Sequence, residues 1–139
     1  MKKSAIYYFL LGCTLLNFAQ TKQLIWEENF DGNQLNSEIW NYELGDGCPD
    51  ICGWGNNEKQ LYTNSNHTVT DGMLTIHINN ENGNITSTRI TTAKKKEFQY
   101  GRIEARAKLP LGKGIWPAFW MLGSNKNKLV GQNVAKLTF

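Results

Sequence analysis

The chain has 139 residues, of which 40% are hydrophobic and 5 are tryptophan. This composition is sufficient for an apolar core and excludes a chain that is disordered by composition. The net charge is +3, and Lys126, Lys128 and Lys136 account for it, so the rest of the chain balances to zero. No broad basic face remains, and a nucleic-acid partner is therefore not predicted.

Residues 1–20 have the features of a secretory signal peptide. Two lysines precede an apolar run at 5–16, and a cleavage site follows near Ala19-Gln20. The run is too short for a comfortable membrane span, and a buried N-terminal helix is the alternative. The residues before Cys13 resemble a bacterial lipoprotein box, but cleavage there would leave apolar residues at the mature terminus. We therefore favour plain secretion, into the medium or the periplasm, over a lipid anchor.

A first strand is predicted at 24–30, and a turn-rich stretch with two cysteines follows it. Secretion would place Cys48 and Cys52 in an oxidising compartment. A turn at Pro49-Asp50 can bring them close enough for a small looped disulfide. A zinc site would need two more ligands, and the 2 histidines show no paired spacing with the cysteines. We rank the disulfide first, then two free thiols, then a metal site.

The remaining sequence is predicted to be nearly all strand. Residues 67–78 read as two short strands about Asp71-Gly72, a strong hairpin signal. Residues 85–93 are β-branched with a period of two, and residues 98–109 alternate between apolar and charged side chains. No helical periodicity appears after the signal segment. Short strands separated by turn signals predict an all-β, antiparallel sandwich.

Four stretches resemble glycoside hydrolase family 16, the laminarinase and β-glucanase family of secreted polysaccharide-cleaving enzymes. In chain order they are WEENFDGNQLNSEIWNYELGDG, CGWGNNEKQLYTNSN, TSTRITT and YGRIEARAKLPLGKGIWPAFWMLG. The resemblance covers 24–124. It implies a concanavalin A-like jelly roll, in which two curved sheets form a substrate cleft on the concave side.

The resemblance implies sugar contacts for five residues. Asn56 and Arg89 resemble donors to sugar hydroxyls, Glu58 orients them, and Trp116 and Trp120 resemble the aromatic floor near the cleavage point. Sugar clefts combine such hydrogen-bonding groups with exposed indole faces. Each residue also has a plainer alternative. Asn56 could belong to a turn pair at 56–57, and Arg89 could be a surface cation. Trp116 and Trp120 would share one face of a strand and could both pack in the core.

The family resemblance also bears on cofactors and partners. It implies no cofactor for catalysis, but a structural calcium near the N-terminal strand, to which Glu28 or Gly72 could contribute oxygens. The implied partner is a β-glucan polysaccharide. We expect no membrane contact after signal cleavage, and a monomer if the chain folds.

The catalytic residues of the family are missing from this sequence. In family 16 the WPAFWML segment precedes a strand E-x-D-x-x-E, which carries the nucleophile and the general acid/base. Retaining glycosidases hold two such carboxyl groups about 5–5.5 Å apart. Residues 125–139 contain no acidic residue, and neither Glu97 nor Glu104 occupies the motif's place. We therefore assign no catalytic residue and expect no hydrolysis by this polypeptide.

The tail at 125–139 is either an ordinary polar chain end or the product of a frameshift. Read two bases later, codons for VGQNVAKLTF can spell WPKCGEIDI through the choice of wobble bases alone. That peptide would supply the first two catalytic carboxylates. The preceding KNKLV permits KQVG in the same frame, so one deleted base near Asn125-Lys126 accounts for the tail. Codons that cannot spell the shifted motif would exclude this hypothesis.

The expected organisation is a signal peptide at 1–20, the N-terminal part of a family 16 domain at 21–124, and an aberrant tail at 125–139. The resemblance implies that the complete domain would hydrolyse internal β-1,3 or mixed β-1,3/1,4 linkages with retention of the anomeric configuration. The motif CGWGNNE favours the laminarinase branch of the family. The alternatives are a lectin-like carbohydrate-binding protein and a non-functional pseudogene product. Since sandwiches often need roughly 200–250 residues, we expect unpaired edges and poor stability.

Overall fold

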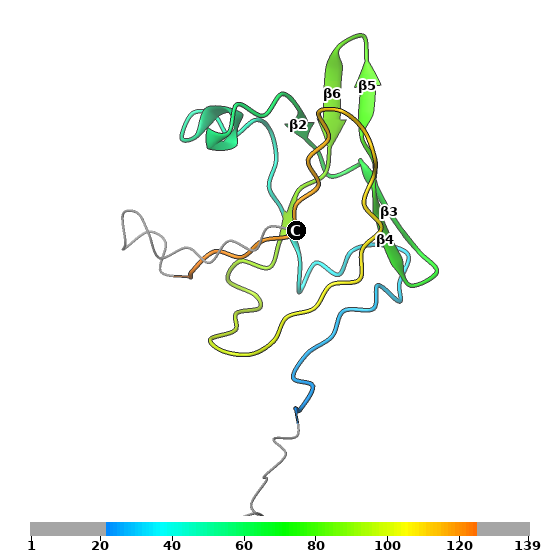
Figure 1. Ribbon diagram of the computed structural model, residues 1–139, viewed down its shortest axis with the longest axis vertical. Coiled ribbons are helices and arrows are strands. Elements are labelled where there is room, and N and C mark those ends of the chain that lie inside the picture. Colours follow the sequence, from blue (N-terminus) through cyan, green and yellow to red (C-terminus); the bar gives the residue numbers. More distant parts are fainter. Residues whose placement is uncertain (1–21, 125–139) are drawn as a thin grey trace, which may run out of the picture.

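The computed structural model describes residues 22–124 (Figure 1). The signal-peptide, lipoprotein and frameshift predictions all fall on residues outside this range. Within it the regular elements are short β-strands and one 3-10 helix, which confirms the predicted all-β class. Among these residues no helix is long and apolar enough to cross a membrane.

The strands form three small sheets. Strands β1 and β7 make one sheet, β2, β6 and β5 make the second in that order, and β3 and β4 make the third. All pairs are antiparallel except β2 with β6, which is parallel. The elements are β1 (Asn41–Tyr42), η2 (Cys52–Gly55), β2 (Leu61–Tyr62), β3 (His67–Thr70), β4 (Met73–Ile76), β5 (Asn79–Glu81), β6 (Asn84–Ser87) and β7 (Ile90–Thr91).

The hairpin predicted about Asp71-Gly72 is present as β3 and β4. Both turn residues have positive φ, 51° and 70°, as a two-residue hairpin turn of type I′ requires. The register pairs Thr70 with Met73 next to the turn. Val69 in β3 is the one buried apolar side chain of the described residues, with 5% of its surface exposed.

The β-branched stretch 85–93 forms two strands rather than one. Strand β6 lies in the second sheet, β7 lies in the first, and Thr88 and Arg89 connect them. The Thr88 hydroxyl donates to the carbonyl of Thr63 at 3.0 Å, so the connection stays anchored beside β2. This change of sheet places the Arg89 side chain at the junction of two sheets.

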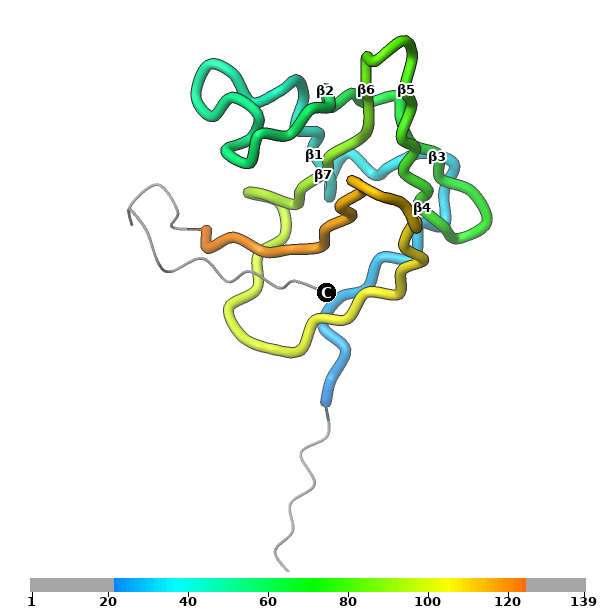
Figure 2. Tube along the Cα trace, turned by 45° about the horizontal axis from the view of Figure 1, so that its top comes forward, coloured from blue at the N-terminus to red at the C-terminus, as the bar shows by residue number. Residues whose placement is uncertain are grey.

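The strands predicted at 24–30 and at 98–109 are absent, so these two predictions were wrong. An alternating segment becomes a strand only when another strand pairs with its backbone groups, and no described strand pairs with either segment. In Figure 2 the yellow and orange part of the chain loops out, passes close to β4 and turns back toward β1 and β7 without joining a sheet. The charged side chains of 98–109 are exposed, with an ion pair between Arg102 and Glu104.

Asn66 ties β6 to the start of β3. This side chain is only 5% exposed, its Nδ2 donates to Thr86 Oγ1 at 3.0 Å, and its Oδ1 accepts from the Thr63 hydroxyl. Removing this side chain breaks two hydrogen bonds to partly buried threonine hydroxyls, at a cost of about 1 kcal/mol or more. We expect Asn66→Ala to speed amide hydrogen exchange in β3 and β6 by about fivefold or more, and Asn64→Ala, at an exposed position, to leave it unchanged. Equal exchange in both variants would contradict this.

Candidate functional site

Arg89 is the centre of the most connected group of polar side chains in the described residues. Its Nε donates to Oε2 of Glu43, and its Nη1 lies 3.8 Å from Oε1 of Glu58. The Arg89 side chain is 16% exposed, and those of Glu43 and Glu58 are 28% and 19% exposed. Two partly buried carboxylates therefore hold one guanidinium group through charge-assisted contacts.

Three aromatic rings surround this guanidinium. Its central carbon lies 4.2 Å from the ring centroid of Trp54, 4.9 Å from that of Trp120 and 5.8 Å from that of Tyr62. Cations at such distances are attracted by the negative face of an aromatic ring. We call the six residues that meet here the Arg89 cluster: Glu43, Trp54, Glu58, Tyr62, Arg89 and Trp120.

Glu58 links the cluster to the loop before β2. Its Oε1 accepts from Asn56 Nδ2 at 3.1 Å, and its Oε2 accepts from Gln60 Nε2 at 2.9 Å and from the Tyr62 hydroxyl at 2.7 Å. Residues 58, 60 and 62 alternate along an extended backbone, so their side chains point to the same side. The result is a row of hydrogen-bonding groups beside the indoles.

A tightly wound loop places Trp54 in the cluster. Cys48 and Cys52 form a disulfide, and the indole Nε1 of Trp54 donates to the carbonyl of Gly45 at 3.3 Å. Gly47 has a φ of 84°, and a Cβ at this position would lie 2.4 Å from the carbonyl oxygen of Ile51. Only glycine fits here, because both the backbone conformation and the space exclude a side chain.

The structure brings four of the five predicted sugar-contacting residues together. Asn56, Glu58, Arg89 and Trp120 belong to one network of hydrogen-bond, charge and cation–aromatic contacts. Trp116 has 75% of its surface exposed. Because 116–120 is not a strand, alternation does not place Trp116 and Trp120 on one face.

Sequence reasoning missed four participants: Glu43, Trp54, Gln60 and Tyr62. The alternation of the Glu58-Lys59-Gln60-Leu61-Tyr62 run could have identified the last two, because Glu58 was already a candidate. No local signal could have identified Glu43, since it contacts Arg89 across 46 positions of the sequence.

The residues named for a structural calcium are used within the fold. The Glu28 carboxylate accepts from the Phe30 amide at 2.9 Å and from Trp40 Nε1 at 3.0 Å. A Cβ at Gly72 would lie 3.5 Å from the Asn29 carbonyl, so this glycine packs against the N-terminal segment. Nowhere in 22–124 do three His, Cys, Asp or Glu side chains gather as metal ligands. Glu28 accepts hydrogen bonds that join residues 28, 30 and 40, and the structural calcium stays a prediction.

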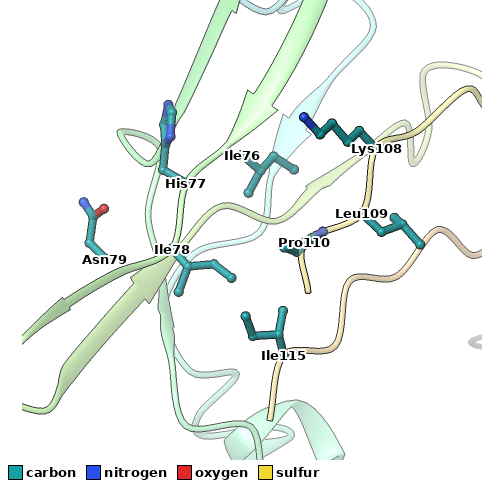
Figure 3. Close-up of a pocket in the computed structure, with 8 residues that line it drawn as sticks. All are labelled: Ile76, His77, Ile78, Asn79, Lys108, Leu109, Pro110 and Ile115. Carbon is teal, nitrogen blue, oxygen red and sulfur yellow. The ribbon is translucent and has the colours of Figure 1, made fainter. Parts of the chain in front are cut away.

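A hollow of about 460 Å³ lies between the end of β4 and the loop at 108–115 (Figure 3). Its lining is mainly apolar: Ile76, His77, Ile78, Asn79, Lys108, Leu109, Pro110 and Ile115. None of the predicted sugar-contacting residues lines it. All eight of these residues are exposed, so it is an open apolar hollow at the surface of the described structure.

Tyr62 gives the site a testable pH dependence. Burial and, after it, the hydrogen bond to Glu58 raise the pKa of Tyr62 above 10.0. As the pH rises, the folded state therefore keeps the Tyr62 phenol proton after the unfolded state has lost it. The contribution of the protonated phenol to the free energy of unfolding is complete below pH 10.0 and is lost as the pH rises above it. Burial also raises the pKa of Tyr42, so we expect tyrosinate absorbance to show late titration in the wild type and one late-titrating group fewer in Tyr62→Phe. Identical titrations of the two proteins would contradict this.

Known proteins are similar to this chain in both fold and sequence. The profile described as "Glycosyl hydrolases family 16" matches residues 55–131. The crystal structure of laminarinase from Flavobacterium sp. UMI-01 has a TM-score of 0.74 and 64% identity, covering 77% of this chain and 46% of that one. Its likeness confirms the jelly-roll fold class.

Two curated relatives carry glucan-related names. Glucan endo-1,3-beta-glucosidase A1 of Niallia circulans is 43% identical over 114 residues, 71% of this chain and 17% of that protein. The beta-1,3-glucan-binding protein of Penaeus monodon is 51% identical over 41 residues, 30% of this chain and 11% of that protein. The chain thus spans less than half the length of each protein compared here. Because the family profile covers more than half of its residues, the chain belongs to glycosyl hydrolases family 16.

Proposed function

We propose that this chain binds β-glucan through the Arg89 cluster and its hydrogen-bonding neighbours. In a complete family 16 domain the same site would hold the substrate for retaining hydrolysis of internal β-1,3 or mixed β-1,3/1,4 linkages. The observation that carries the proposal is the meeting of indoles and hydrogen-bonding groups around Arg89. The glucan-related names of the relatives support it.

The chemistry of the site suits a chain of glucose units. A pyranose presents apolar C–H patches on its faces and hydroxyls at its rim, so it fits a site with aromatic rings beside polar groups. Trp120, with 38% of its surface exposed, offers a ring to such a face. Asn56, also exposed, donates to Glu58 in the structure and can donate to a sugar hydroxyl through its other amide hydrogen.

We propose that these 139 residues do not themselves hydrolyse glycosidic bonds. The two carboxylates of the Arg89 cluster, those of Glu43 and Glu58, both pair with Arg89. Retaining hydrolysis needs two carboxyl groups about 5–5.5 Å apart that flank the scissile bond, one as nucleophile and one as acid, whereas these two share one guanidinium. We assign no step to a metal or another cofactor.

We further propose that the chain is secreted and monomeric. The charged start, apolar run and cleavage site at 1–20 support secretion, and the disulfide between Cys48 and Cys52 suits an oxidising compartment. Release of the mature chain into the medium, with a mass that fits cleavage after Ala19, would test this.

Calorimetry and a reducing-sugar assay on the purified chain test the function directly. We expect binding of a β-1,3-linked glucose tetrasaccharide, no binding of an α-1,4-linked tetrasaccharide of equal length, and no release of reducing sugar from laminarin. Failure to bind the β-linked sugar would overturn the binding role and favour a product without function. Release of reducing ends would overturn the proposed lack of hydrolysis.

A further inference from the structure

We infer that Glu43 is a positioning residue of the site, which acts through Arg89 to hold the indole of Trp120 where a sugar ring binds. This role rests on the proposed β-glucan binding. Glu43 itself need not touch the sugar, since the Arg89 guanidinium lies between it and the ring.

Trp120 needs such a support because its own segment has no strand pairing. Residues 93–124 contain no strand, so within the described part of the chain no sheet ladder fixes their backbone. A contact that joins Trp120 to the sheets is the Arg89 guanidinium, 4.9 Å from the centroid of its ring. The position of Arg89 therefore contributes to the position of this indole.

Glu43 fixes Arg89 more firmly than Glu58 does. The register of β1 with β7 pairs Asn41 with Thr91 and Tyr42 with Ile90, and the next pair in this ladder is Glu43 with Arg89. The Glu43 amide donates to the Arg89 carbonyl at 3.0 Å, which confirms that the pairing continues past the strand ends. Side chains of directly opposed residues lie on the same face of a sheet, and the Glu43 carboxylate meets Arg89 Nε there.

Glu58 is a weaker anchor for the guanidinium. Its nearest oxygen lies 3.8 Å from Arg89 Nη1, beyond hydrogen-bond distance. Both of its oxygens already accept from other groups, which are Asn56, Gln60 and Tyr62. Loss of the Glu43 charge would therefore leave Arg89 without its one charge-assisted hydrogen bond and allow the guanidinium to turn away from Trp120.

A double-mutant cycle separates this role from simple structural support. Glu43→Gln keeps the size of the side chain and removes its charge, and we expect it to weaken binding of the β-1,3-linked tetrasaccharide roughly tenfold. Trp120→Ala should weaken it by a similar factor or more. If Glu43 acts through Trp120, the double variant binds no more weakly than Trp120→Ala alone, although no contact joins residues 43 and 120 directly.

The chain offers a matched control and a readout without sugar. Glu104 also pairs with an arginine, but this pair is exposed, 66% at Arg102 and 63% at Glu104. We expect Glu104→Gln to bind the tetrasaccharide like the wild type. In the absence of sugar, acrylamide should quench tryptophan fluorescence more strongly in Glu43→Gln than in Glu104→Gln, because the Trp120 ring is released.

The binding measurements distinguish failure of the proposed function from failure of the positioning role of Glu43. A wild-type chain that binds no tetrasaccharide overturns the proposed function, and the positioning role with it. A wild type that binds, with equal affinity in Glu43→Gln or with additive losses in the cycle, overturns the positioning role alone. If Glu43→Gln loses the far-ultraviolet spectrum of the wild type, Arg89→Lys replaces it in the same cycle. This variant keeps the cation and removes the planar group above the indole.

Discussion

Arg89→Ala is expected to abolish measurable binding of β-1,3-glucan oligosaccharides, with an affinity at least about a hundredfold below that of the wild type. The change removes the cation that Glu43 and Glu58 share and leaves two partly buried carboxylates close together. Breaking a fully buried pair costs about 3–5 kcal/mol. The 16–28% exposure of these side chains reduces this to about 2–3 kcal/mol through solvent screening.

The cation–aromatic contacts add to this effect. Arg89 lies 4.2 Å from the Trp54 centroid and 4.9 Å from the Trp120 centroid, so alanine also removes the group that spaces the two rings. Arg102→Ala is the matched control, because Arg102 is an exposed arginine paired with one exposed glutamate. Calorimetric titration should show wild-type affinity for Arg102→Ala. Binding by Arg89→Ala at wild-type affinity would exclude the Arg89 cluster as the site.

The parts of the structure that the sequence predicts are those that local signals determine. The β3–β4 hairpin depends on two turn residues with positive φ, Asp71 and Gly72, and both are visible in the sequence. The disulfide depends on two cysteines four positions apart. Asn56, Glu58 and Arg89 were found through family motifs, and the fold then places them together.

The parts that escape prediction depend on distant partners. Segment 98–109 has strand alternation, yet it forms no strand, because pairing and not alternation supplies its backbone hydrogen bonds. Glu43 becomes part of the site only through the register of β1 with β7. A single sequence does not show such a register, since many alignments of two short strands satisfy the same pattern.

The chain is expected to bind the dye ANS strongly and to unfold without a cooperative thermal transition. In the described residues Val69 is the only buried apolar side chain, whereas Leu111 is 97% exposed and Ile78 is 51% exposed. Ordering each residue costs about 1–2 kcal/mol of backbone entropy, and so small a buried core does not offset this cost. Leu111→Ser should lower ANS fluorescence, and Lys113→Ser, on the same loop, should leave it unchanged.

Oligosaccharide binding should partly reverse both the strong ANS binding and the lack of cooperative unfolding. A ligand that binds only the ordered site stabilises it by RT ln(1 + [L]/Kd), about 2.7 kcal/mol at a hundredfold excess over Kd. Saturating β-1,3-linked tetrasaccharide is therefore expected to lower ANS fluorescence and sharpen the thermal transition of the wild type, but not of Arg89→Ala. A sharp transition without sugar and without ANS binding would show that the exposed apolar side chains are covered in solution. If the sugar changes the ANS fluorescence and the thermal transition equally in the wild type and in Arg89→Ala, the sugar does not order the chain through the Arg89 cluster.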